Sequence, residues 1–187
     1  EDHEAKGPWH PNLDLERLQV ALRWMMLNRT FDQRMWQIQR QGRISFYMQA
    51  RGEEAISIAQ GMALRSGDMC FPSYRNQALY MYRGMSLVDM MCQCLSNTRD
   101  MCKGRQLPVM YHSADDRLFS ISGNLGTQFP QAVGWAMASA IKGEEHVAAS
   151  WIGDGTTAEA DFHHAVTFAS VYQAPVLLNI VNNQYAI

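Results

Sequence analysis

The strongest constraint in this chain is a Gly-Asp-Gly sequence at residues 153–155 that is followed by an Asn-Asn pair at residues 182–183. Residues 146–152 form a short apolar run that ends at a glycine, which is typical of a buried strand in a parallel sheet. A second apolar run, residues 176–181, predicts another buried strand that ends at Asn182. Residues 156–181 suffice for one helix, two short loops and this strand, so we expect a strand-helix-strand unit.

A right-handed crossover in such a unit brings the carboxyl ends of both strands to one rim, where open α/β sheets bind ligands. Thr156 and Glu159 have the spacing of a capping box, which predicts a helix N-terminus directly after the glycine turn. Its free amides suit an anion. A diphosphate there would be repelled by Asp154 unless a hard cation lay between them, and Mg²⁺ prefers oxygen ligands. Asp154, the Asn183 amide oxygen and a carbonyl near Tyr185 could supply them.

The same residues have a plainer interpretation. Glycine, aspartate and asparagine dominate ordinary turns, so both motifs could be turns at strand ends. The spacing favours the ligand site, because one strand-helix-strand unit returns the second motif to the first. Glycines on both sides of Asp154 also let the main chain approach a phosphate closely.

Further segments occur in a recognisable order, at residues 45–48, 52–55, 71–75, 103–108 and 121–128. Together with the two motifs above, they resemble the α subunit of the thiamine-diphosphate-dependent branched-chain 2-oxo acid dehydrogenases, also called 2-oxoisovalerate dehydrogenases, particularly bacterial forms. The resemblance runs from about residue 13 to Ile187 and covers an N-terminal and central fragment of such a subunit.

The fold expected from pattern and resemblance is α/β, with a parallel sheet flanked by helices as part of a thiamine-diphosphate-binding fold. We expect residues 1–42 to form a lead-in and a long N-terminal helix that ends near Gly42, and residues 43–187 to form the binding domain without its C-terminal part. Further helices are predicted at 53–64, after residue 74, at 86–95 and at 127–141. The long helix is predicted from its apolar residues: Leu15, Leu18, Leu22, Met25, Met26, Met35 and Ile38.

The resemblance implies thiamine diphosphate with Mg²⁺ as cofactors. It implies that Asp154, Asn183 and the Tyr185 carbonyl bind Mg²⁺ and that Tyr74 and Arg75 contact the cofactor, with the arginine on the diphosphate. The planar fork of an arginine suits a phosphate, although Tyr-Arg at a helix start is also common surface packing. The main chain facing the cofactor would come from Leu125, Gly153, Gly155 and Thr156.

A candidate potassium site is also implied by the resemblance. Neutral oxygens that suit a monovalent cation come from Ser122, Asn124, Thr127 and Gln128. The same residues could equally form an ordinary loop and a helix N-cap.

The implied activity is oxidative decarboxylation of branched-chain 2-oxo acids such as 3-methyl-2-oxobutanoate, with acyl transfer to lipoyl-lysine of the transacylase component. The family assembles as an α2β2 heterotetramer, the activating glutamate comes from the β subunit and the catalytic histidine is expected beyond Ile187. No catalytic residue is therefore assigned here, and we expect the fragment alone to be inactive. Two alternatives remain: a pyruvate or acetoin dehydrogenase α subunit, and a non-catalytic cofactor-binding or assembly module.

Substrate preference depends on two segments. Residues 103–112 lack the glycine-rich stretch ending in Ser-Met-His that pyruvate-using relatives carry, which favours the branched-chain group. Phe46, Tyr47 and Met48 could line an acyl pocket, although an aromatic-methionine run is more often core.

The composition argues against a nucleic-acid-binding protein and against a membrane protein. Sixteen basic and 18 acidic residues give a net charge of −2 without a basic run, so we expect no nucleic-acid partner. No apolar stretch has the length of a membrane span, so no membrane partner is expected either. The four cysteines lack a zinc-site spacing and are predicted to be buried free thiols in a reducing compartment, the cytoplasm of a bacterium or the mitochondrial matrix of a eukaryote: Cys70, Cys92, Cys94 and Cys102.

Overall fold

A parallel three-stranded sheet organises the computed structural model, which describes residues 12–186. Its strands are β1 (Met69–Phe71), β2 (Ala148–Gly153) and β3 (Val176–Val181), in the order β1-β2-β3. The register pairs Phe71 with Ser150 and Gly153 with Val181. The predicted α/β class with a parallel sheet is confirmed, and β3 covers residues 176–181 as predicted. β2 begins at residue 148 rather than 146.

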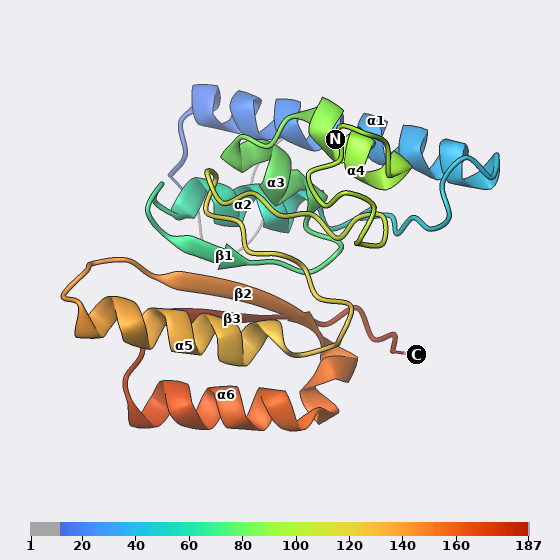
Figure 1. The fold of residues 1–187 in the computed structure, drawn as a ribbon. Coiled ribbons are helices and arrows are strands. Elements are labelled where there is room, and N and C mark those ends of the chain that lie inside the picture. The colour runs from blue at the N-terminus through green and yellow to red at the C-terminus, as the bar shows by residue number, and fades with distance from the viewer. Residues whose placement is uncertain (1–11, 187) are drawn as a thin grey trace.

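Helices cover both faces of the sheet (Figure 1). On one side lie α5 (Gln128–Ile141) and α6 (Ala160–Val171). On the other side lie α1 (Leu15–Arg40), α2 (Glu54–Ala63), α3 (Gln77–Arg83) and α4 (Leu87–Leu95). These bounds agree closely with the helices predicted from the sequence.

The largest part of the core lies between α1, α3, α4 and the sheet. Trp151 of β2 and Tyr80 of α3 are fully buried in it. Tyr47 belongs to the same cluster, and Phe46 and Met48 pack against it. This placement favours the core interpretation of residues 46–48. A smaller cluster joins α5 and α6 to β2 through Phe129, Val133, Ile152 and Ala165.

The N-terminal helix α1 starts at a cap in which the Asp14 carboxylate accepts a 2.7 Å hydrogen bond from the Arg17 amide. Its C-terminal half packs on α2 and α3 and buries Phe31, Met35 and Ile38. Several apolar residues of its N-terminal half are exposed, whereas Trp24 packs against the core. The exposed ones include Leu15, Leu18, Leu22 and Met26.

The two ends of the sequence lie outside the described residues. They are residues 1–11, which include the predicted lead-in, and Ile187. The catalytic histidine that the resemblance places beyond Ile187 is therefore not tested by the structure and stays a prediction. The division into two parts at residue 42 also stays a prediction.

The predicted capping box at Thr156 and Glu159 is wrong. Residues Asp154–Ala158 form a 3-10 turn, η1, and α6 begins only at Ala160 with no side-chain cap from Glu159. The Thr157 hydroxyl donates a 2.7 Å hydrogen bond to the Asp154 carbonyl, which tightens this turn. The Thr156 side chain is buried against the loop at Gly126 and is not used as a cap.

Two expectations from composition can be compared with the structure. Cys70, Cys92 and Cys94 are buried free thiols as predicted, whereas the free Cys102 is half-buried, with its sulfur 3.3 Å from Nδ1 of His112. Within residues 12–186, no helix is long and apolar enough to cross a membrane.

Candidate functional site

The candidate site lies at the rim formed by the carboxyl ends of the three strands. All three strands run toward the same side of the molecule, where the C-terminal segment also ends (Figure 1). Tyr74 and Arg75 follow β1, Asp154 follows β2, and Asn183 follows β3. The parallel register therefore brings Asp154 and Asn183, which were predicted at the ends of β2 and β3, to one edge. Tyr74 and Arg75 reach the same edge after β1, a strand that was not predicted from the sequence.

The Asp154 side chain has a buried oxygen without a partner. Its Oδ1 atom is inaccessible to solvent and receives no hydrogen bond from the described residues. Buried polar atoms are nearly always hydrogen-bonded, because an unpaired one costs about 1–3 kcal/mol. An oxygen ligand left open beside a glycine turn fits a hard cation such as Mg²⁺.

The second half of the motif lies directly against the first. A Cβ placed on Gly155 would collide with the Cβ of Ala186, so the segment after β3 passes over the Asp154 turn. Only a glycine permits this close approach.

Asn183 and Tyr185 occupy a tight turn in that segment. The Asn183 amide oxygen accepts a 3.0 Å hydrogen bond from the Tyr185 amide, and its second lone pair remains for another partner. The Tyr185 ring is 85% exposed, so a role at this rim would come from the main chain, as the resemblance implies. Both residues lie in the segment between Val181, which pairs with Gly153, and Ala186, which approaches Gly155, while their Mg²⁺ ligation stays a prediction.

Within residues 12–186 there is no group of three or more His, Cys, Asp or Glu side chains able to hold a metal ion. A cation at the rim would therefore depend on Asp154, neutral protein oxygens and oxygens of a ligand. Mg²⁺ commonly binds in this way, through one or two carboxylates and substrate phosphates.

The loop before α5 also reaches the rim. Gly126 has a φ of +88°, and a Cβ there would lie 3.2 Å from Cγ2 of Thr156, so this loop packs on η1. Leu125 is exposed beside it. The loop thus lies next to the Asp154 turn, as the predicted main-chain contacts of Leu125 and Thr156 require.

The predicted potassium ligands lie in and after this loop. The Asn124 amide donates to Oγ of Ser122 at 3.0 Å, and the Thr127 hydroxyl donates to the Asn124 carbonyl at 3.2 Å. The Gln128 side chain donates to the Trp151 carbonyl at 2.8 Å, while its Oε1 atom is buried and has no hydrogen-bond partner among residues 12–186. Thr127 occupies the N-cap position of α5, but its side chain does not cap the helix. The potassium site stays a prediction.

The guanidinium of Arg75 contacts three other residues. Its Nη1 atom donates to the Gln49 carbonyl, its Nε atom lies 3.9 Å from Oε1 of Glu53, and its guanidinium lies 5.6 Å from the centre of the Tyr74 ring. Burial raises the pKa of the Glu53 carboxyl, Arg75 opposes this change, and the neighbouring Glu54 adds to it.

Sequence reasoning missed the contacts of Arg75 with Gln49 and Glu53. Glu53 belongs to the segment at residues 52–55 that carries the family resemblance and to the start of a predicted helix, but the sequence assigned no site role to Glu53 or to Gln49. Residues 49 and 75 lie far apart in the sequence, so no local pattern reports their contact. The Gly-Glu-Glu sequence at residues 52–54, which precedes a helix near the predicted rim, is the one signal that could have indicated Glu53.

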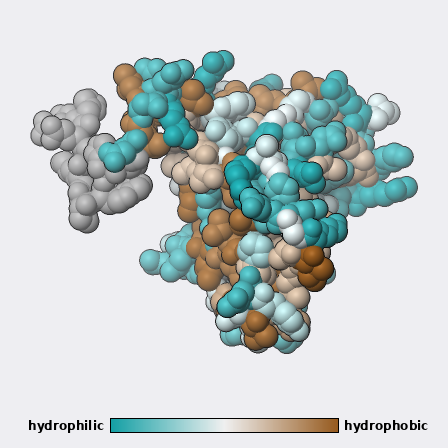
Figure 2. Space-filling model, turned by 90° about the vertical axis from the view of Figure 1, so that its left-hand side faces the viewer, coloured by the Kyte–Doolittle hydropathy of each residue, from teal (hydrophilic) through white to brown (hydrophobic). Residues whose placement is uncertain are grey.

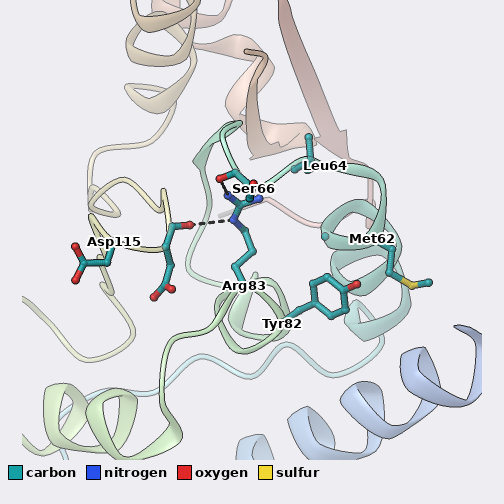
Figure 3. Close-up of a pocket in the computed structure, with 8 residues that line it drawn as sticks. Met62, Leu64, Ser66, Tyr82, Arg83 and Asp115 are labelled. Carbon is teal, nitrogen blue, oxygen red and sulfur yellow. Dashed lines mark hydrogen bonds between the residues drawn. The ribbon is translucent and has the colours of Figure 1, made fainter. Parts of the chain in front are cut away.

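A hollow of about 320 Å³ lies elsewhere, between the end of α2, α3 and the turn at residues 115–116 (Figure 3). Arg83 crosses it and donates to the backbone carbonyls of Asp116 and Ser66 at 3.0 and 3.1 Å. Residues 64–68 beside it lead into the amino end of β1, so this hollow is separate from the rim.

Comparisons with known proteins agree with this geometry. Residues 22–187 match the family described as dehydrogenase E1 component. The whole chain is 60% identical to the 2-oxoisovalerate dehydrogenase subunit alpha of Pseudomonas aeruginosa and covers 46% of that protein. It is 39% identical over 183 residues to the mitochondrial counterpart of Dictyostelium discoideum, covering 98% of the chain and 42% of that protein.

The human mitochondrial 2-oxoisovalerate dehydrogenase subunit alpha is 38% identical over 177 residues, which are 95% of this chain and 40% of the human protein. The chain thus spans less than half the length of these relatives. The family match covers most of the chain and includes every residue of the rim described above. The chain therefore belongs to the dehydrogenase E1 component family.

Proposed function

We propose that this chain is the N-terminal and central part of the α subunit of a branched-chain 2-oxo acid dehydrogenase. The observation that carries the proposal is the buried, unpartnered oxygen of Asp154 at a rim shared with Arg75, in a chain 60% identical to a 2-oxoisovalerate dehydrogenase subunit alpha. The complete enzyme would oxidatively decarboxylate 3-methyl-2-oxobutanoate and pass the acyl group to lipoyl-lysine of the transacylase component.

The rim fits thiamine diphosphate with Mg²⁺. Bound there, thiamine diphosphate supplies the carbon nucleophile and the electron sink that decarboxylation of a 2-oxo acid requires. Asp154 and Asn183 would hold Mg²⁺ through side-chain oxygens and Tyr185 through its carbonyl. Arg75 would donate to the diphosphate. Thr156 and the adjacent glycines would bring the η1 main chain close to it, and K⁺ at residues 122–128 would steady the neighbouring loop.

A partner subunit is supported by the molecular surface. Figure 2 shows apolar residues gathered on the lower part of one face, the part that contains the sheet, α5 and α6. The exposed large apolar residues of this part include Ile141, Val171, Tyr172, Leu177 and Ile180. Apolar surface of this kind normally contacts other protein. We propose an α2β2 assembly with β subunits that also docks the lipoyl-bearing transacylase.

The proposed compartment follows the relatives, which include a bacterial protein and mitochondrial proteins. Three buried thiols and one half-buried thiol, all unpaired, are consistent with a reducing environment. We propose the cytoplasm for a bacterial source and the mitochondrial matrix for a eukaryotic one.

The test uses the full-length α subunit assembled with its β partner. Decarboxylation of 3-methyl-2-oxobutanoate and of pyruvate is compared at saturating thiamine diphosphate and Mg²⁺. We expect a higher kcat/KM for the branched-chain acid. An equal or higher value for pyruvate would instead support a pyruvate or acetoin dehydrogenase. Cofactor binding without turnover of these acids would favour a non-catalytic module.

A further inference from the structure

We propose that Glu53 is a positioning residue for the diphosphate: together with the Gln49 carbonyl, its carboxylate fixes the guanidinium of Arg75 in the orientation that binds phosphate oxygens. The inference rests on the proposed function, because it assumes a diphosphate at the rim. Its physical basis is the set of contacts around Arg75.

The contacts divide the guanidinium into a held edge and an open edge. Nη1 donates to the Gln49 carbonyl, whereas Nη2 makes no hydrogen bond to any residue within 12–186. The Nε atom lies 3.9 Å from Glu53 Oε1, which is too long for a hydrogen bond. Glu53 therefore attracts the guanidinium by charge without using up a donor. Nη2 and the second hydrogen of Nη1 remain available to donate to phosphate oxygens.

Partial burial strengthens this attraction. The side chain of Glu53 is 17% exposed and that of Arg75 is 31% exposed. Opposite charges interact more strongly at such a site than in bulk water, because the local dielectric constant is lower. The remaining exposure of Arg75 leaves its guanidinium open to a ligand at the rim.

The segment that carries Gln49 and Glu53 is itself fixed to the core. Asp32 of α1 is 1% exposed and accepts hydrogen bonds from the Ala50 amide at 3.1 Å and from Nε2 of Gln49 at 3.2 Å. The Glu53 amide donates to the Ala50 carbonyl at 2.9 Å, and Gly52 supports the intervening turn with a φ of +97°. The backbone that carries both groups is therefore fixed before a ligand arrives, which reduces the ordering cost of binding.

The test is a thiamine diphosphate titration of the cofactor-stripped α2β2 enzyme at saturating Mg²⁺. Glu53→Gln keeps the size of the side chain and removes its charge, so we expect Kd to rise about three- to tenfold. Asp89→Asn is the matched control, because it removes the carboxylate of an exposed ion pair with Arg99 at 2.9 Å. The control is expected to bind like the wild type.

A double-mutant cycle separates positioning from a general effect on the fold. We expect Glu53→Gln to weaken binding in the wild-type background and to have no effect when Arg75 is already replaced by Gln. A loss of equal size in both backgrounds would show that Glu53 acts through the fold and would overturn the inference. Wild-type affinity in Glu53→Gln would also overturn it.

The pH profile of the same titration gives a second readout. Arg75 and Glu54 are the charged groups that act on Glu53, and burial is the largest cause of its raised pKa. Glu53 therefore becomes neutral at a higher pH than an ordinary glutamate, and wild-type affinity should fall as pH falls through that pKa. Glu53→Gln should lack this fall in affinity, and a pH profile identical to that of the wild type would contradict the proposal.

A wild-type enzyme that binds no thiamine diphosphate would overturn the proposed function and this inference together.

Discussion

The hydroxyl of Tyr47 donates a 3.0 Å hydrogen bond to Oδ1 of Asp32, and this contact joins α1 to the segment that leads into α2. Both residues are buried. Burial raises the pKa of the Asp32 carboxyl, while its hydrogen bonds with the Ala50 amide, Tyr47 and Gln49 oppose the change. A carboxylate from the N-terminal helix thus fastens the segment that supports Arg75.

Replacing Tyr47 by Phe tests how much this fastening stabilises the fold. The change removes a donor from a buried carboxylate and should lower the free energy of unfolding of the full-length α subunit by about 1–3 kcal/mol. Urea unfolding followed by circular dichroism measures the difference. Tyr172→Phe is the control, since that ring is 59% exposed and the loss of its hydroxyl should change stability by less than about 0.5 kcal/mol. Equal stabilities of the two variants would contradict a fastening role for Tyr47.

The two glycines beside Asp154 should respond differently to substitution. A Cβ on Gly155 would collide with Ala186, whereas a Cβ on Gly153 meets no atom within 4 Å. Gly155→Ala should therefore destabilise the full-length subunit by about 1–3 kcal/mol, because the segment after β3 must move. Gly153→Ala should change stability by less than about 0.5 kcal/mol. Thermal unfolding of both variants checks the difference, and similar melting temperatures would argue against this packing.

Two of the three strands at the rim could be predicted from the sequence. Strands β2 and β3 are short apolar runs with glycine or asparagine at their ends, and the crossover rule then fixes where residues 154 and 183 emerge. Strand β1 has only three residues and is followed by a proline, so it lacks this signal and was not predicted. Strand β3 and helix α5 were predicted closely because each is bounded by local signals, such as Pro175 before the strand.

Other parts of the site could not be predicted, because they depend on contacts between distant segments. Thr156 and Glu159 have the spacing of a capping box, yet packing of Thr156 against Gly126 prevails over that local preference. The contacts of Arg75 with Gln49 and Glu53 join the turn after β1 to the segment before α2. No periodicity or local motif encodes such a contact.

The pair formed by Arg29 and Glu54 should make stability depend on pH. Burial alone would raise the pKa of Glu54, but the hydrogen bond from Arg29, at 2.5 Å, and that from the Gly52 amide outweigh it and lower the pKa. A lowered pKa means that the ionised carboxylate stabilises the fold above its unfolded pKa of about 4.5, and that this contribution is lost as pH falls through the folded pKa.

Glu54→Gln should therefore lower the melting temperature of the full-length subunit at pH 7, and the difference from the wild type should shrink as pH falls below about 4.5. Thermal unfolding at pH 7, 5.5 and about 4 tests this. Asp89→Asn serves as the comparison, since Asp89 also has a lowered pKa, caused first by the Ser86 hydroxyl, but lies in an exposed pair. At pH 7, Asp89→Asn should lower the melting temperature by less than Glu54→Gln does. A Glu54→Gln difference that grows on acidification would contradict the assignment.

Asp154→Asn tests the proposed metal site most directly. The buried Oδ1 atom has no partner among the described residues, so removing the negative charge should leave the fold intact while weakening Mg²⁺ binding. In the assembled α2β2 enzyme, we expect the Kd for thiamine diphosphate at a fixed Mg²⁺ concentration to rise about tenfold or more, with partial recovery as Mg²⁺ is increased. The control is Asp115→Asn, which changes an exposed carboxylate outside the rim. This variant should bind thiamine diphosphate with the same Kd as the wild type. An unchanged Mg²⁺ dependence in Asp154→Asn would show that this carboxylate is not a metal ligand, since loss of an anionic ligand must alter metal affinity.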